Sequence, residues 1–196
     1  MSDEQAKTPA EIIKAAGGVG SYLAHILGSV PDNLLGLGVG DWLHHKRKRH
    51  LAILGQNIRW LLEIRETERI TEPNPAVLIP LLQAAADEAE EELQAMWAGL
   101  LANAMLDGGR RVRADYIEVL RKLAPRDASV LGGLSEAECK KATPPPFAGL
   151  PPEEQISVEG LSRHGCVEVD DRGTVYTTAF GRGLLAACTL TPTKQA

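Results

Sequence analysis

The side chains with the clearest capacity for chemistry lie in one short run, His44 to His50, which reads His-His-Lys-Arg-Lys-Arg-His. Imidazole rings are common zinc ligands, but His45 and His50 are five residues apart, and ligands on one helix face need spacings of three or four. Four adjacent cations would also repel a divalent ion. These cations are Lys46, Arg47, Lys48 and Arg49. We therefore interpret the run as a basic helix face, and the sequence predicts neither a metal site nor a cofactor.

The three cysteines, Cys139, Cys166 and Cys188, are odd in number and far apart, which fits a reducing compartment better than a disulfide framework. His164 could act as a base for a Cys166 nucleophile, but no acid partner is indicated. Glu138 and Lys140 have the acid-x-Lys spacing of some metal nucleases, yet they lack the strand and the preceding Asp of such a site. We interpret Cys166 and Cys188 as small buried residues. The sequence predicts no catalytic residues and therefore no enzyme.

A second charged segment follows, and it is acidic. It begins with Glu88, Glu90, Glu91 and Glu92, and no basic residue occurs between Ala84 and Gly109. Acids on a helix face are usually solvated, although these could bind a cation. Because the basic and acidic segments are cleanly separated, we interpret them as two interaction surfaces that meet each other, a protein partner or a second copy of the chain. These surfaces are Lys46, Arg47, Lys48 and Arg49 on one side and Glu88, Glu91 and Glu92 on the other.

The segment before the basic run, Ala15 to Trp42, leaves a membrane alternative open. It is rich in glycine and apolar residues, but Pro31-Asp32-Asn33 interrupts it, so neither half supplies the ~20 apolar residues of a spanning helix. It could instead lie on an anionic membrane surface, where each neighbouring Lys or Arg contributes about 1 kcal/mol. The protein would then be a membrane-perturbing effector. Otherwise the absence of a recognisable signal peptide predicts a cytoplasmic location.

Two helices are predicted to position these charges. One runs from about Leu34 to Ile70 and ends at the prolines 73 and 75. Its inner stripe is predicted to be Leu51, Leu54, Ile58 and Leu61. The second is a single amphipathic helix from near Pro80 to Asp107, with its acids on the outer face. Its apolar stripe is predicted to be Leu78, Leu82, Ala85, Ala89, Leu93, Met96, Leu100 and Ala104.

The C-terminal part is predicted to form a smaller module. Pro125 and Asp127 open a helix that continues to about Lys141, and a stiff proline-rich connector follows. A helix over 153–164, a hairpin formed by strands 167–169 and 174–177, and a last helix over 180–188 complete the chain. This order resembles the second half of a winged helix.

A DNA-binding regulator is the remaining alternative, but charge argues against it. Helix 153–164 carries three acids and one arginine, and so does the hairpin, so each element has a net charge of −2. The whole chain has a net charge of −5. DNA-binding surfaces normally carry an excess of Lys and Arg, so nucleic acid is disfavoured as a partner.

The predicted fold class is mainly α, a helical hairpin or bundle followed by a small winged-helix-like α+β module. Three units are predicted. Residues 1–33 form a Gly-rich helical segment, residues 34–141 form the helical bundle, and residues 142–196 form the connector and the C-terminal module.

Three sequence blocks resemble a known family. An acidic stretch is followed by Met96-Trp97-Ala98-Gly99-Leu100-Leu101-Ala102-Asn103-Ala104, and then by Leu123-Ala124-Pro125-Arg126-Asp127-Ala128. Together with the segment 178–188, these blocks are similar to the abortive infection alpha family of bacterial phage-defence proteins. The signature residues are Trp97, Leu100, Leu101, Asn103, Pro125 and Asp127. The resemblance implies a bacterial defence protein whose signature residues are structural, with no active site to transfer.

Overall fold

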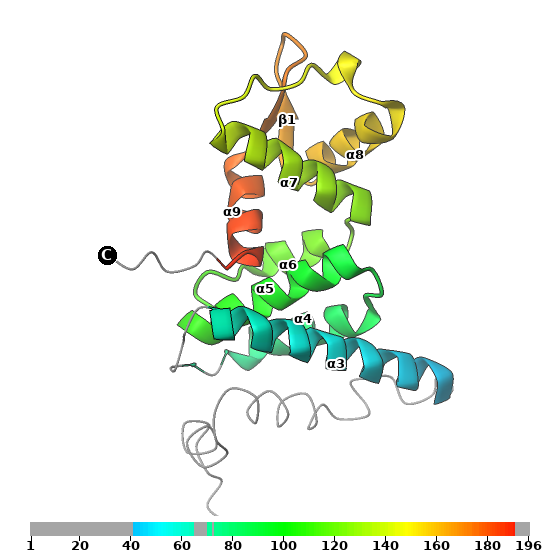
Figure 1. Ribbon diagram of the computed structural model, residues 1–196, viewed down its shortest axis with the longest axis vertical. Coiled ribbons are helices and arrows are strands. Elements are labelled where there is room, and N and C mark those ends of the chain that lie inside the picture. The colour runs from blue at the N-terminus through cyan, green and yellow to red at the C-terminus, as the bar shows by residue number, and fades with distance from the viewer. Residues whose placement is uncertain (1–40, 65–69, 72, 191–196) are drawn as a thin grey trace, which may run out of the picture.

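A computed structural model of the chain describes residues 41–64, 70, 71 and 73–190 (Figure 1). The predicted Gly-rich unit 1–33 lies outside these residues, and so does the part of the long helix before residue 41. The described chain is mainly helical, with a two-stranded antiparallel sheet near the C-terminus. This confirms the predicted fold class at that level.

The basic helix is α3, Asp41–Ile64. Its inner stripe is confirmed at the first three predicted positions, because Leu51, Leu54 and Ile58 are buried. Leu61 is only half-buried, and Leu62 takes the inward position in its place. Among the described helices, none combines the length and the apolar character needed to cross a membrane.

The acidic segment forms two helices, so the prediction of a single helix was wrong. Helix α4 spans Pro75–Asp87 and α5 spans Glu91–Asp107, and Glu88 between them has an extended backbone with ψ at 127°. The apolar spacing of three and four continues across this break, so periodicity alone could not reveal it. Ala89, which was assigned to the buried stripe, is exposed in the break.

Helix α4 also begins earlier than predicted, at Pro75 rather than near Pro80. The side-chain oxygen of Asn74 accepts a hydrogen bond from the backbone N–H of Ala76 at 2.9 Å. Pro75 then occupies the first helical position. Proline has no backbone N–H, and an N–H at this position would have no intrahelical acceptor in any case. The Asn-Pro pair is therefore the start signal, and Pro80 lies inside the helix.

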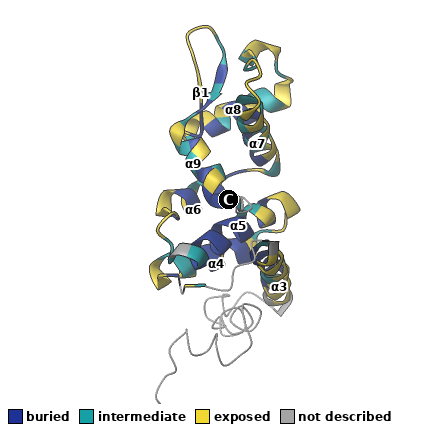
Figure 2. Ribbon diagram, turned by 60° about the vertical axis from the view of Figure 1, so that its left-hand side comes forward, coloured by how far each residue is buried: buried dark blue, intermediate teal, exposed yellow. Residues whose placement is uncertain are grey.

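Helix α5 is the centre of the fold. Every residue from Trp97 to Met105 is buried, so this part of the helix is not amphipathic as predicted (Figure 2). Helices α3 and α4 contact α5, and so do two later helices, α7 (Pro125–Cys139) and α9 (Ala179–Cys188). A helix surrounded in this way must be apolar on every side, and its acids accordingly lie at its two ends, with Glu91 and Glu92 in the first turn and Asp107 at the last position.

Two helices follow α5, and the start signal predicted for the second is confirmed. Helix α6 spans Ala114–Leu120 and buries Tyr116 and Leu120, and α7 spans Pro125–Cys139. Pro125 occupies the first turn of α7, and the Asp127 carboxylate accepts the backbone N–H of Ala124 at 2.9 Å. Such a contact satisfies an amide at the helix start that has no intrahelical partner.

The C-terminal module has the predicted order of elements. A 3-10 turn, η1 (Phe147–Gly149), precedes α8 (Pro152–Arg163), strands β1 (Val167–Val169) and β2 (Val175–Thr177), and α9 (Ala179–Cys188). The strands pair antiparallel, with Val167 opposite Thr177. The proline connector adds a bridge that was not predicted, because Pro146 pairs with Thr174.

Helix α9 joins the two halves of the molecule (Figure 1). It contacts α5 on one side and α7 and β2 on the other. The amide of Asn103 on α5 donates to the carbonyl of Ala187 at 2.7 Å and to that of Thr189 at 3.2 Å. The buried apolar side chains from α3 to α9 form one cluster, and α7 packs on α8 across the boundary predicted at residue 142. These contacts do not test the predicted division into units 1–33, 34–141 and 142–196, which stays a prediction.

Candidate interaction surfaces

The basic turn of α3 contacts the C-terminal end of α4. Lys46, Lys48 and Arg49 are exposed, whereas Arg47 is half-buried and its Nε lies 2.5 Å from Oδ1 of Asp87. The ring of His50 is buried, and its Nδ1 lies 2.9 Å from the carbonyl oxygen of Ala86. Arg47 and His50 thus hold the basic turn against the last residues of α4.

The acidic break begins where this contact ends. The carboxylate of Glu88 accepts the backbone N–H groups of Ala89 and Glu90 at 2.9 and 3.0 Å. The amide of Gln94 reaches back from α5 and donates to the carbonyls of Ala85 at 3.1 Å and Glu88 at 2.6 Å. The break is therefore an ordered turn, in which side chains form hydrogen bonds with the backbone groups that two helix ends leave unpaired.

The other predicted acids differ in their surroundings. Glu91 is exposed in the first turn of α5, where a negative charge is favoured by the helix dipole. Glu92 is also exposed, but its carboxylate accepts the hydroxyl of Ser129 on α7 at 2.9 Å. Of the three acids predicted as a surface, Glu88 and Glu92 therefore have roles within the fold. We call the basic turn 46–49 together with the acids 87–92 the charged junction.

Replacing Gln94 with Ala should destabilise the fold by about 1–3 kcal/mol, because the carbonyl of Ala85 would lose a donor in a buried site. Gln83 on α4 is exposed and offers a matched control. Its replacement with Ala should change the free energy of unfolding by less than about 0.5 kcal/mol. Urea unfolding of both variants measures the difference. Equal stability of the two variants would show that the Gln94 amide does not hold the break.

The prediction that Cys166 and Cys188 are small buried residues is confirmed. Cys166 and Cys188 are buried, and Cys139 is exposed. Burial raises the pKa of the Cys166 thiol to about 11, and burial also raises the pKa of the Cys188 thiol. The Cys166 sulfur lies 3.9 Å from the backbone carbonyl of His164. A buried thiol that stays protonated at neutral pH is a poor nucleophile.

Thiol labelling should therefore modify one cysteine in the native chain at pH 8, namely Cys139, and all three in denaturant. The same burial makes stability depend on pH. Folding raises the pKa of Cys166, so its buried protonated thiol contributes to the free energy of unfolding. This contribution is complete below the ordinary thiol pKa of 9.0 and is lost as the pH rises towards about 11. Cys139→Ser should remove the native signal. A second thiol that reacts rapidly in the native Cys139→Ser chain would contradict this assignment.

Glu138 is engaged in the fold rather than poised for chemistry. Its carboxylate accepts the backbone N–H of Thr177 at 2.6 Å and lies 3.5 Å from the guanidinium of Arg182. It thereby ties α7 to β2 and to α9. Lys140, the other half of the acid-x-Lys pattern, pairs with Glu136 at 2.5 Å. The structure thus gives each of these two residues a different partner.

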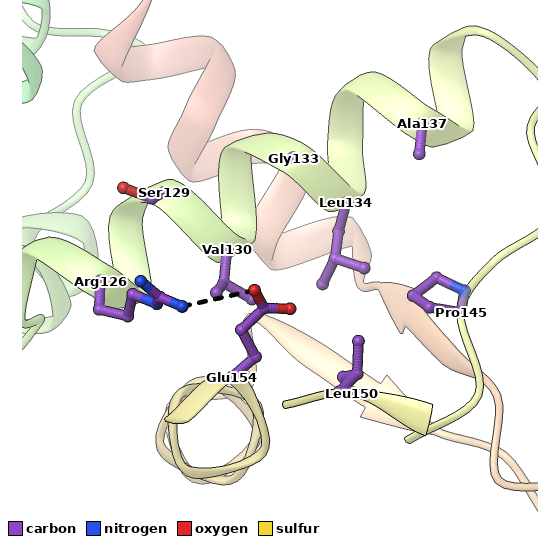
Figure 3. Close-up of a pocket in the computed structure, with 9 residues that line it drawn as sticks. All are labelled: Arg126, Ser129, Val130, Gly133, Leu134, Ala137, Pro145, Leu150 and Glu154. Atoms are coloured by element: carbon purple, nitrogen blue, oxygen red, sulfur yellow. Dashed lines mark hydrogen bonds and ion pairs between the residues drawn. The ribbon is translucent and has the colours of Figure 1, made fainter. Parts of the chain in front are cut away.

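A groove of about 500 Å³ lies between α7, the proline connector and α8 (Figure 3). Val130, Leu134 and Leu150 supply much of its apolar lining. Arg126 of α7 and Glu154 of α8 face one another across one end at 3.5 Å. This groove could not be predicted from the sequence, because Val130 and Leu134 follow the pattern of core residues. Its charged groups already neutralise one another, so it offers a place for an apolar segment rather than an acid and base pair.

The family signature residues hold the fold together. Trp97, Leu100, Leu101 and Asn103 are buried on α5, and Pro125 and Asp127 open α7. The sequence did not indicate the roles of Asp87 in the charged junction or of His50 and Gln94 beside it. One available signal was the run of acids from Asp87 to Glu92, since acids favour the first turn of a new helix.

Together these features define a class of protein, which is mainly helical, with signature residues in the core and opposite charges gathered where α3 meets the α4–α5 break. The chain belongs to the abortive infection alpha family, because the family model described as "Abortive infection alpha" matches residues 46–188. This confirms the predicted resemblance. No match was found among the curated proteins or among the solved structures.

Proposed function

We propose that this chain is an abortive-infection defence protein that acts through protein contacts rather than through chemistry of its own. The observation that carries the proposal is the charged junction, which places a basic turn beside an acidic break on a rigid core. Lys46, Lys48 and Arg49 project from one side of it and Glu91 from the other. Opposite charges on neighbouring helices suit a partner surface with the complementary pattern, because such complementarity fixes orientation and speeds association.

The surroundings of the cysteines and of Glu138 support the second half of the proposal, namely that the chain acts without chemistry of its own. Cys166 and Cys188 are buried with raised pKa values, and Glu138 is held by Thr177 and Arg182. The side chains that were the candidates for catalysis in the sequence therefore pack in the core or bind other parts of the fold. The family assignment supports the first half, since its members are grouped under abortive infection.

The two alternatives have less support. The membrane-perturbing effector depends on residues 15–42, and of these the structure describes only the backbone of residues 41 and 42, at the start of α3. The DNA-binding alternative gains one feature, because the Pro146–Thr174 bridge places the connector beside the hairpin as in a winged helix. It still requires α8 and the hairpin, each with a net charge of −2, to face phosphates. The predicted cytoplasmic location is part of the proposal.

The defence role is tested by expressing the chain in a phage-sensitive bacterium. We expect fewer plaques than with the empty vector, and at high multiplicity we expect infected cells to die before they release phage. An aggregation-prone core variant expressed from the same vector controls for the burden of expression. Unchanged plaque number and unchanged phage yield across a panel of unrelated phages would overturn the defence role.

A further inference from the structure

We infer that two copies of this chain pair through the outer face of α3, with the two α3 helices antiparallel. Five exposed residues on this face recur at steps of four and three, which places them in one line along the helix. They are Arg49, Ile53, Gln56, Trp60 and Glu63. We call this line the outer stripe. It lies opposite the buried stripe that packs on the core, so the core of the chain does not cover it.

The outer stripe is more apolar than a solvated helix face needs to be. Trp60 is 62% exposed and Ile53 is 38% exposed. Residues seven apart on a helix lie on the same side about 10 Å apart, so these two side chains form a single patch. A large aromatic residue beside an aliphatic one is typical of the centre of a protein interface.

The charges at the two ends of the stripe point to a second copy. Arg49 precedes Gln56 by seven residues, and Glu63 follows it by seven. No ion pair joins either of them to another residue that the structure describes. A two-fold axis near Gln56 would bring Arg49 of each copy beside Glu63 of the other, and would lay Trp60 against Ile53 of the partner copy. An isologous interface requires this reciprocal match.

Other arrangements fit the stripe less well. A parallel pairing would put Arg49 against Arg49 and Glu63 against Glu63, and both contacts repel. An anionic membrane would attract Arg49 but repel Glu63 at the other end of the same line, and the chain as a whole carries a charge of −5. The antiparallel pair satisfies both charges and covers the apolar patch. It goes beyond the proposed function, with which it shares Arg49 alone, because it concerns the face of α3 that points away from α4 and α5.

Analytical ultracentrifugation of the full chain tests the pairing. We expect a species of twice the 21.1 kDa chain mass at micromolar concentration. Ile53→Glu and Trp60→Glu should each raise the dimer dissociation constant about tenfold or more. Ile156 on α8 is 68% exposed and provides the matched control, so Ile156→Glu should leave the constant unchanged. Circular dichroism should show the same helix content in all of these variants.

A charge swap tests the antiparallel register. Arg49→Glu and Glu63→Arg should each weaken the dimer, because each places like charges side by side at both ends of the interface. The double variant Arg49→Glu/Glu63→Arg should restore it. A wild-type chain that is monomeric throughout the micromolar range would overturn the inference. So would a dimer that resists Trp60→Glu, a double variant without rescue, or a monomer that sediments with phosphatidylserine vesicles and loses this binding on Trp60→Glu.

Discussion

Replacing Gly99 with Ala should destabilise the protein by about 3 kcal/mol or more, or prevent it from folding. Gly99 lies on α5 where α9 crosses it, and a Cβ built there would lie 1.7 Å from the carbonyl oxygen of Cys188. The obstacle is backbone, which cannot rotate away as a side chain can. The two helices would have to separate, and the hydrogen bonds from Asn103 to Ala187 and Thr189 would lengthen with them.

Gly132, inside α7, provides a matched control because a Cβ there would meet nothing within 4 Å. Gly132→Ala should stabilise the protein by about 0.5–1 kcal/mol, since Ala is the better helix former. The free energy of unfolding in urea measures both changes. If Gly99→Ala were as stable as Gly132→Ala, the close contact between α5 and α9 would be wrong.

Replacing Trp97 with Ala should cost about 3–5 kcal/mol, because it empties the largest buried side chain of the core. Among the residues that the structure describes, the indole Nε1 of Trp97 has no hydrogen-bond partner, so we expect its role to be packing alone. Trp97→Phe should therefore cost only about 1–2 kcal/mol, which corresponds to the lost volume. Thermal unfolding followed by circular dichroism can rank the two variants.

Ile156→Ala serves as the control for these variants, because it removes an apolar side chain from the surface. It should change stability by less than about 0.5 kcal/mol. A Trp97→Ala protein that keeps its stability but loses phage protection would contradict the structural role of the signature residue. It would place Trp97 in a functional site instead.

Much of the fold followed from local signals in the sequence. Pro125 and Asp127 mark the start of α7 because their chemistry suits a helix N-terminus. The alternation at Val167–Val169 and Val175–Thr177, separated by a turn that includes Gly173 with φ at +77°, predicts the hairpin. Such signals act between neighbours in sequence, so they can be read without the tertiary structure.

The break between α4 and α5 could not be predicted in the same way. Two side chains stabilise it. The amide of Gln94 donates to carbonyls six and nine residues away, and the carboxylate of Glu88 accepts the backbone N–H of the next residue. The apolar spacing passes through the break unchanged because both helices pack on the same core. A helix period shows which side of a segment is buried, but it does not show whether the backbone continues as a helix.

The charged surfaces were predicted in part. The sequence shows that Lys46–Arg49 and Glu88–Glu92 are segregated, but not that Arg47 pairs with Asp87 or that Ser129 donates to Glu92. These contacts link residues 37 to 40 positions apart, so only the fold brings them together. They also show that Arg47 is a poor choice for testing function, because its removal would disturb the packing of α3 on α4.

Phage protection by the variant Lys46→Glu/Lys48→Glu tests the central claim most directly. Both side chains are exposed on the basic turn, and neither belongs to the outer stripe of α3. The charge-matched control is Arg121→Glu/Lys122→Glu, at two exposed residues beyond α6. With both proteins folded and equally abundant, we predict that the first variant loses at least tenfold in protection and that the control retains it. Full protection by the Lys46→Glu/Lys48→Glu variant would contradict a function carried by the charged junction.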